Sequence, residues 1–352
     1  MTLPPTRVPD PSTAPPLRWG IVAPGRIAGA FAHALKTHTR QELVAVGSRS
    51  QERADQFAAE YEVPRSYGSY DELLAQDDID IVYIASPHSH HEEQARAAIA
   101  AGKHVLVEKA MSTSAESARR MVAAAREADV AVMEAMWMRF QPHIDVVKQC
   151  VEDGLLGPIE MLRADHGQAF PFDPHHRLYD HALGGGAMLD LGVYPLSFSA
   201  FLLGLPQRLE VAGTRTSTGV DRQVTVLLHQ FDAHPHAHAL ATTTLAAKTP
   251  CTASVNGAEA RIEIPGRFYQ GQQLTIVHRD DTIEVGPEPT LTGSSGLAYE
   301  AAHFAQLVAD DARESLVMPP DESIALLQLI EEALESMPSP PADAQTLNEW
   351  AI

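Results

Sequence analysis

Short apolar runs alternate with alanine-rich helical segments through the first 135 residues of the chain. The apolar runs contain few charges, which suits strands buried on both faces of a sheet; they span 17–22, 42–48, 80–86, 104–109 and 130–135. The segments between them have helical spacing of apolar residues; they span 26–35, 51–61, 91–102 and 114–128. Strand–helix–strand alternation requires a parallel sheet with right-handed crossovers. The sequence therefore predicts a doubly wound α/β domain of the Rossmann type.

The pattern changes after residue 136. A helical pattern over 141–153 is followed by a strand pattern over 158–169 and by a second helical pattern after the glycines at 184–186. Alternating residues then predict the strands of a mostly antiparallel sheet; they cover 208–216, 222–231, 237–245, 251–257, 260–266 and 273–279. Helical spacing returns at 297–310 and 320–336. We predict a second domain of the α+β class.

A chain of 352 residues exceeds the size of one ordinary hydrophobic core. We therefore predict two domains, the first at 17–136 and the second at 137–337. The proline-rich start, residues 1–16, is predicted to be a disordered tail, because it lacks the apolar core of a signal peptide. Residues 338–352, which contain several prolines, are predicted to be a C-terminal tail.

Composition limits the classes of partner. A formal net charge of −20 argues against a surface that coats nucleic acid or another polyanion. The apolar stretches are interrupted well short of a membrane span, so we expect no membrane partner. Two cysteines cannot form a disulfide framework, which favours a reduced cytoplasmic setting.

Residues 20–28, GIVAPGRIA, lie between the first predicted strand and the first predicted helix, where dinucleotide-binding turns occur. Gly25 holds the position that must lack a side chain if backbone is to approach a pyrophosphate. Ala28 holds the position where a small residue lets helix and strand pack closely. Ala23 replaces the usual tight-turn glycine, which predicts a turn without positive φ at this residue. A strand–helix turn that binds no ligand is the alternative.

The end of the second predicted strand carries a cation where an acid would bind a ribose 2′-hydroxyl. Ser48, Arg49 and Ser50 stand there, and Arg53 follows one helical turn later. A guanidinium beside hydroxyls suits a 2′-phosphate and favours NADP over NAD. A solvated cation with no ligand is the alternative for Arg49.

Three further side chains suit proton transfer. Lys109 follows Glu108 at the carboxyl edge of the predicted parallel sheet, where such sheets bind ligands. Asp190 and Tyr194 are four residues apart, and on a regular helix they would share one face. The structural alternatives are a surface lysine and a buried tyrosine that is hydrogen-bonded to Asp190.

Together these motifs resemble the glucose–fructose oxidoreductase/inositol dehydrogenase/rhizopine-catabolism (GFO/IDH/MocA) family. The likeness covers about residues 17–337, and MEAMWMRFQP at 133–142 resembles the branch of dimeric dihydrodiol and NADP-linked D-xylose dehydrogenases. The resemblance implies an open-faced second sheet that serves as substrate floor and dimer interface. It implies catalytic roles for Lys109, Tyr194 and Asp190. The cofactor contacts that it implies are Ala23, Gly25, Arg26, Ile27, Ser48, Arg49, Arg53, Ser86, Pro87, His88, His91, Glu108, Lys109, Trp137 and Arg139.

One residue departs from the family pattern beside Lys109. Ala110 stands where proline is usual, at a position that often follows a cis bond. A cis bond before a non-proline residue costs about 2.5–4 kcal/mol, so we expect this bond to be trans.

Histidines crowd residues 165–186, at His166, His175, His176 and His181. No pair has the spacing of a helical metal site, and neighbouring glycines and prolines favour a loop that covers substrate. We predict no metal cofactor.

The sequence thus predicts an NADP-dependent dehydrogenase or reductase that acts on a secondary alcohol or carbonyl of a sugar, polyol or cyclic diol. We expect a cytoplasmic homodimer or higher homo-oligomer. Two alternatives stay open: an NAD-dependent glycoside hydrolase that uses transient internal oxidation, and a non-catalytic dinucleotide-binding regulator. Substrate identity, reaction direction and the choice of Tyr194 or Lys109 as proton carrier also stay open.

Overall fold

The computed structural model describes residues 3–337, which divide into two units. The Rossmann unit comprises residues 8–140 and 291–324, and the open-sheet unit comprises residues 3–7, 141–290 and 325–337. The prediction of one continuous second domain was therefore wrong, because residues 291–324 belong with the first. The predicted tail at 338–352 lies outside the described residues.

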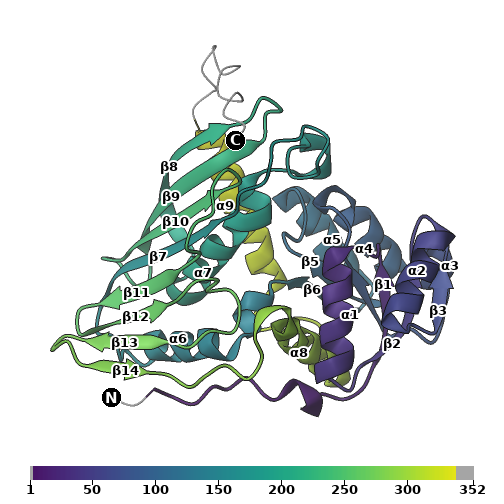
Figure 1. The fold of residues 1–352 in the computed structure, drawn as a ribbon, viewed down its shortest axis with the longest axis horizontal. Coiled ribbons are helices and arrows are strands. Elements are labelled where there is room, and N and C mark those ends of the chain that lie inside the picture. Colours follow the sequence, from purple (N-terminus) through teal and green to yellow (C-terminus); the bar gives the residue numbers. More distant parts are fainter. Residues whose placement is uncertain (1–2, 338–352) are drawn as a thin grey trace. The chain divides into compact units, whose positions relative to one another are not determined.

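The Rossmann unit is built on a six-stranded parallel sheet, which confirms the predicted fold class (Figure 1). Its strand order is β3-β2-β1-β4-β5-β6. The strands are β1 (Arg18–Val22), β2 (Glu42–Gly47), β3 (Arg65–Tyr67), β4 (Ile81–Ile84), β5 (His104–Glu108) and β6 (Val132–Ala135). The order reverses between β1 and β4, and ligands of such sheets bind outside the carboxyl ends of the strands at that reversal.

This unit also contains the helices α1 (Arg26–His38), α2 (Gln51–Tyr61), α3 (Tyr70–Leu74), α4 (His91–Ala100), α5 (Ala115–Glu127) and α8 (Leu297–Ala309). Serine side chains cap two of them: Ser50 accepts the N–H of Arg53 at the start of α2, and Ser114 caps α5 in the same way. Helix α8 packs against α1, and the ring of Phe304 meets that of Trp19 on β1 with centroids 6.3 Å apart. This packing explains why α8 belongs to the Rossmann unit.

The open-sheet unit contains an eight-stranded sheet with the order β14-β13-β12-β11-β7-β10-β9-β8. Its strands are β7 (Ile159–Gly167), β8 (Pro206–Arg215), β9 (Asp221–Phe231), β10 (His238–Thr244), β11 (Ala253–Gly257), β12 (Ala260–Ile264), β13 (Thr275–His278) and β14 (Ile283–Val285). All neighbours run antiparallel except β7 and β10, which are parallel. The predicted, mostly antiparallel sheet is confirmed.

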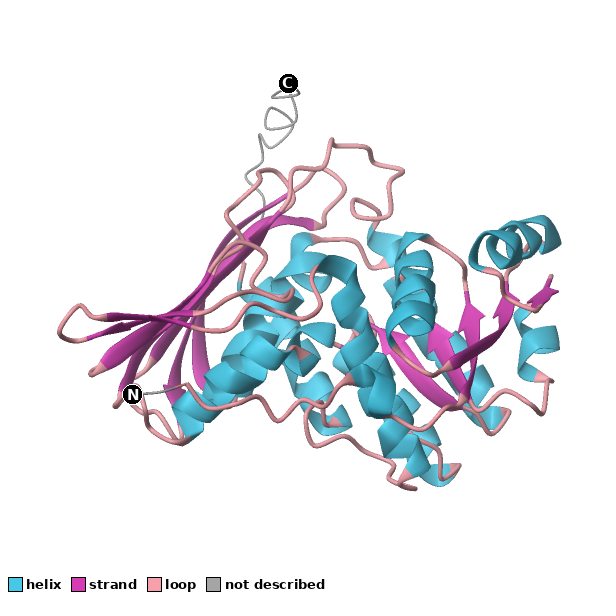
Figure 2. Ribbon diagram, turned by 60° about the horizontal axis from the view of Figure 1, so that its bottom comes forward, coloured by secondary structure: helices cyan, strands magenta, loops and turns pink. Residues whose placement is uncertain are grey.

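Helices lie along one face of this sheet (Figure 2). The remaining helices are α6 (Pro142–Glu152), α7 (Val193–Leu203) and α9 (Pro320–Ser336), and α7 packs on β7 and β10. On the opposite face the sheet has two hollows of about 500 and 590 Å³, and Thr242 of β10 lines both. This face is covered by no helix of the open-sheet unit within residues 3–337.

One apolar segment is longer than we expected. Among the described residues, His181–Leu203 has the length and composition of a membrane span, and 94% of its most apolar window is buried inside the protein. Such burial is typical of a core helix, and α7 forms the C-terminal part of this segment.

The predicted disorder of residues 1–16 was wrong for residues 3–16, which have defined contacts. Arg7 forms an ion pair with Asp145 of α6 at 2.7 Å. The guanidinium of Arg40 donates a hydrogen bond to the carbonyl of Thr13 at 2.9 Å. Proline-rich backbone has little conformational entropy to lose, so a few such contacts are enough to order it.

Candidate active site

The glycine turn connects β1 to α1 and has a geometry that differs in part from our prediction. Ala23 has φ of 66°, so the predicted absence of positive φ was wrong. Its backbone N–H donates to the carbonyl of Gly47 at 3.1 Å, and this contact to β2 helps to hold the turn.

Gly25 has the free space beside its backbone that a pyrophosphate needs. Its φ of −133° is open to any residue, and a Cβ placed there would meet no protein atom within 4 Å. The fold itself therefore does not demand glycine here. Helix α1 starts beside it with no side-chain cap, so its first N–H groups, from Arg26 and Ile27 onward, are available to an anion.

Three side chains gather at the end of β2. Tyr70 forms a side-chain hydrogen bond with Arg49, and the nearby charges of Arg49 and Arg53 oppose a rise in the Tyr70 pKa that burial causes. The guanidinium of Arg53 donates to the carbonyl of Pro24 at 3.3 Å, which connects this group to the glycine turn. Ser48 is buried at the same strand end. The cluster therefore presents two cations and a phenol beside the turn.

The loop after β4 divides the predicted cofactor contacts into two kinds. Ser86 and Pro87 are partly exposed, whereas His88 and His91 are buried. Both ring nitrogens of His91 lie against backbone carbonyls, of Ser86 at 2.8 Å and Ala110 at 3.1 Å, and burial lowers its pKa to about 3. His91 thus has no surface for a cofactor, and its ring instead supports the loop.

The peptide bond between Lys109 and Ala110 is cis, so the expected trans bond was wrong. Neighbouring groups contact the backbone on both sides of it. His88 Nε2 lies 3.2 Å from the Lys109 carbonyl, and the N–H of Met111 donates to Glu134 Oε1 at 3.0 Å. Glu134 is buried, and its interactions include the charge of Lys109.

Two buried carboxyl groups, of Glu108 and Glu300, lie near each other, and Glu108 directly precedes Lys109. Glu108 at the end of β5 accepts a short hydrogen bond from the hydroxyl of Tyr83. Glu300 of α8 is fully buried, and both of its carboxyl oxygens are without a hydrogen-bond partner among the described residues. Burial and the nearby charge of Glu108 raise the pKa of Glu300 well above its usual range. Both effects therefore favour the protonated, neutral form of the Glu300 carboxyl.

Two predicted cofactor contacts after β6 are buried. Trp137 is 7% exposed, and the side chain of Arg139 has no exposed surface. The Arg139 guanidinium forms an ion pair with Glu322 at 2.7 Å and donates to the carbonyl of Val317 at 3.2 Å. These contacts give Arg139 a structural role inside the Rossmann unit, in place of the predicted cofactor contact.

In the open-sheet unit, Asp190 lies on a π-turn, Met188–Gly192, immediately before α7. The predicted regular helical face shared with Tyr194 is therefore interrupted by a wider turn, a feature that is frequent at functional sites. Two nitrogens of the Arg177 guanidinium each lie 3.2 Å from Asp190 Oδ1. Asp190 is thus paired with a cation of its own unit.

Tyr194 lies in a cluster of three rings. Its ring centroid is 5.1 Å from that of His166 on β7 and 4.9 Å from that of Tyr269. His166 and Tyr269 stack on each other at 4.4 Å, and burial raises the pKa of Tyr269 to about 12. The three rings pack on one another and are all buried, and each combines flat apolar faces with a polar edge.

The predicted histidine-rich stretch does not act as one group. His166 is buried in the ring cluster, whereas His175, His176 and His181 are exposed. Across residues 3–337, no group of three or more His, Cys, Asp or Glu side chains could hold a metal ion.

Sequence reasoning missed Tyr70, Tyr269, Glu134 and Glu300. The two tyrosines follow no spacing pattern. The two glutamates did carry a signal, because each stands inside an apolar run, VMEA and LAYEAA, and a buried charge in such a run needs an explanation.

Comparison with known proteins gives matches to both units. The profile of the oxidoreductase family with an NAD-binding Rossmann fold, GFO_IDH_MocA, matches residues 17–136. The profile of the GFO/IDH/MocA C-terminal domain matches residues 144–263.

Individual relatives match over nearly the whole chain. The human trans-1,2-dihydrobenzene-1,2-diol dehydrogenase is 34% identical over 328 residues, 91% of this chain and 97% of the relative. KijD10, a 3-ketoreductase from Actinomadura kijaniata solved with NADP and TDP-benzene, has a TM-score of 0.80 at 27% identity, covering 93% of this chain and 99% of the other. An aldose-aldose oxidoreductase from Caulobacter crescentus has a TM-score of 0.81 at 24% identity over 92% of this chain and 97% of the other, which supports the fold. This chain belongs to the GFO/IDH/MocA family of NAD(P)-dependent oxidoreductases that act on CH–OH groups.

Proposed function

We propose that the protein is an NADP-dependent oxidoreductase that transfers hydride between the nicotinamide and a secondary alcohol or carbonyl of a cyclic diol, polyol or sugar. The observation that carries the substrate class is the ring cluster around Tyr194, with His166 and Tyr269. Flat apolar faces suit a cyclic substrate, and the dihydrodiol dehydrogenases are relatives at about a third identity.

The preference for NADP rests on the cations at the end of β2. Arg49 and Arg53 lie with Tyr70, and this group contacts the glycine turn through Pro24. Guanidinium groups bind phosphate oxygens through charge-assisted hydrogen bonds, which a 2′-phosphate offers and a 2′-hydroxyl does not.

Tyr194 and Lys109 are assigned to proton transfer. When bound, the nicotinamide supplies the hydride acceptor or donor. Oxidation of a carbinol requires the hydroxyl proton to go to a base within hydrogen-bond reach. We assign this proton to the phenol oxygen of Tyr194. The alternative gives the proton to Lys109 and leaves Tyr194 to position the hydroxyl, and Asp190 with Arg177 orients the substrate in either case.

Two variants test these roles. We expect Tyr194→Phe and Lys109→Met to lower kcat by about two to four decades while NADP+ affinity stays near normal. A cyclic trans-diol or an aldose with NADP+ is the assay, followed by the absorbance of the reduced nicotinamide. A purely structural Tyr194 instead predicts a lower Tm with normal kcat in the folded fraction, so Tm is measured on the same preparations. Bond cleavage without net absorbance change would favour the hydrolase, and binding without turnover the regulator.

We also propose a cytoplasmic homodimer that forms through the uncovered face of the eight-stranded sheet. The support for assembly is the open face itself, where Leu240 and Thr242 line hollows and Met161 is 38% exposed. The support for the location is that both cysteines, Cys150 and Cys251, are buried thiols without a disulfide.

A further inference from the structure

A carboxylate from a distant strand lies at the start of the helix that carries Asp190 and Tyr194. Asp221 is the first residue of β9 and is 3% exposed. Its Oδ2 accepts the backbone N–H of Met188 at 2.7 Å. Burial raises the pKa of Asp221 to about 6, and backbone hydrogen bonds, from Met188 and Ala187 among others, oppose that rise. The carboxylate thus receives the first N–H groups of the helix.

The residues before the helix cannot supply this cap themselves. Gly186 has no side chain and a φ of 122°, and a Cβ there would collide with Asp221 Oδ1. A Cβ on Gly185 would lie 2.7–2.8 Å from three backbone carbonyls. The glycine run therefore leaves room for Asp221. Its carboxylate, from a distant strand, accepts the N–H groups at the helix start that an Ncap side chain usually accepts.

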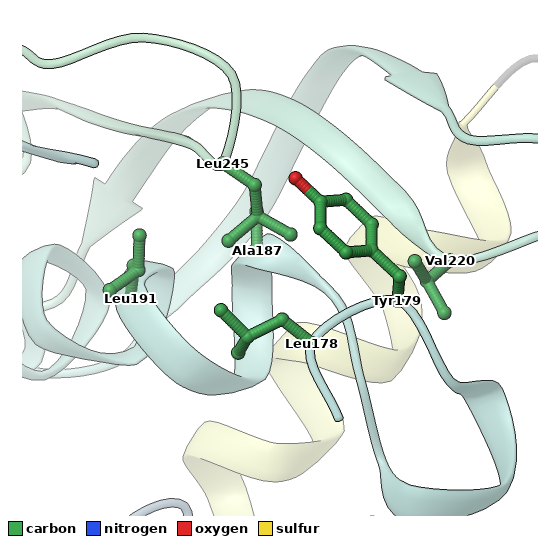
Figure 3. Close-up of a cluster of buried hydrophobic side chains, with 6 residues drawn as sticks. All are labelled: Leu178, Tyr179, Ala187, Leu191, Val220 and Leu245. Atoms are coloured by element: carbon green, nitrogen blue, oxygen red, sulfur yellow. The ribbon is translucent and has the colours of Figure 1, made fainter. Parts of the chain in front are cut away.

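A cluster of buried apolar side chains includes the chain neighbours of both cap partners, Ala187 beside Met188 and Val220 beside Asp221 (Figure 3). The side chains of this cluster come from the loop before the helix, the helix start, the π-turn, the residue preceding Asp221 and the residue after β10; they are Leu178, Tyr179, Ala187, Leu191, Val220 and Leu245. Hydrogen bonds to a carboxylate are stronger where such packing keeps water out. The negative charge also interacts favourably with the positive end of the helix dipole.

We propose that Asp221 is a positioning residue for the hydride-transfer reaction, because its carboxylate holds the helix start from which Asp190 and Tyr194 project. This inference rests on the function proposed above. Asp221 acts through the helix backbone and itself needs no contact with the substrate. Because a displacement of about 1 Å of a reacting group can cost on the order of 100-fold in rate, a loosened cap is expected to reduce kcat.

The test compares two carboxylates with the same local chemistry in the same unit. Asp221→Asn keeps one acceptor oxygen but loses the charge, and Asp221→Ala loses both. The matched control is Asp165→Asn, because Asp165 also accepts two adjacent backbone N–H groups, of Cys251 and Thr252, each at 2.9 Å. Asp165 contacts the loop before β11 and does not contact the Tyr194 helix through these bonds.

We expect kcat to fall about tenfold or more in Asp221→Ala and less in Asp221→Asn, with NADP+ affinity unchanged. Asp165→Asn should lower Tm and leave kcat in the folded fraction unchanged. Amide hydrogen exchange over residues 187–194 should accelerate in the Asp221 variants only. Normal kcat in folded Asp221→Ala would overturn the positioning role.

Amide hydrogen exchange distinguishes a failure of this inference from a failure of the proposed function. If the wild-type protein shows no turnover with diols or aldoses, the reaction and the positioning role within it both fail. The exchange experiment then still decides whether Asp221 caps the helix, and unchanged exchange in Asp221→Ala would overturn the cap as well.

Discussion

Glu300 shows how a single buried side chain can make the stability of the protein depend on pH. Burial and the Glu108 charge raise its pKa in the folded protein, so the folded state binds a proton that the unfolded state releases. Stability is therefore lost as pH rises above the unfolded pKa of about 4.3, until the folded pKa is reached.

The variant Glu300→Gln should remove this slope. We expect its free energy of unfolding to improve relative to wild type as pH rises from 5 to 8, because an amide stays neutral. Urea unfolding at several pH values measures the difference, with the exposed Glu127→Gln as the control. Parallel curves for wild type and Glu300→Gln would show that Glu300 is not the source.

The predicted preference for NADP over NAD also depends on a single side chain, that of Arg49. We expect Arg49→Ala to weaken NADP+ binding by about one to two decades, because a hydrogen bond to a charged group contributes about 1.5–3 kcal/mol. NAD+ binding should change little, since NAD+ has no 2′-phosphate. Calorimetric titration with both cofactors is the measurement. Equal weakening of both would mean that Arg49 does not bind the phosphate.

At the scale of the element, the glycine turn is tested by substitutions at Gly25 and Ala23. We expect the first to weaken NADP+ binding and the second to leave it unchanged. Gly25→Val adds a side chain that meets no protein atom within 4 Å at its Cβ, so the fold should tolerate it. NADP+ affinity should nevertheless fall at least tenfold, because the side chain would hold phosphates away from the start of α1. Tm and NADP+ affinity are measured together.

Ala23→Gly is the matched control for that variant. Alanine at φ of 66° is unfavourable by about 1–2 kcal/mol, and glycine relieves this cost while adding unfolded-state entropy. We therefore expect little net change in Tm and normal NADP+ affinity. Normal affinity in Gly25→Val would remove the turn from the cofactor site.

At the scale of the whole molecule, the uncovered sheet face predicts self-association. Leu240→Lys places a charge on that face, and burying an unpaired charge in an interface is costly. We expect wild-type protein to have twice the 38.1 kDa mass of one chain in light scattering, and Leu240→Lys to be monomeric. Leu316→Lys is the control, because Leu316 is 96% exposed in the other unit. A dimeric Leu240→Lys would place the interface elsewhere.

Local patterns were enough to predict most elements of this protein. The helix predicted over 51–61 is α2, and the one predicted over 320–336 is α9, with the same bounds. Strand patterns likewise gave β5 and β9 to within one residue of each end. The reason is physical, since helix and strand periods record which side chains of one segment are buried, and that information is contiguous in the chain.

Partnerships between distant segments were decided only by the tertiary structure. Nothing near Gly186 indicates that Asp221 will cap its helix, and nothing near Glu108 indicates Glu300. The same holds for His91, whose ring supports the Lys109 turn, and for residues 291–324, which join the Rossmann unit through α8. The sequence by itself determined the elements, the glycine turn and the family. Burial, charge partners and the surfaces left for ligands depend on which elements meet, and only the folded chain decides that.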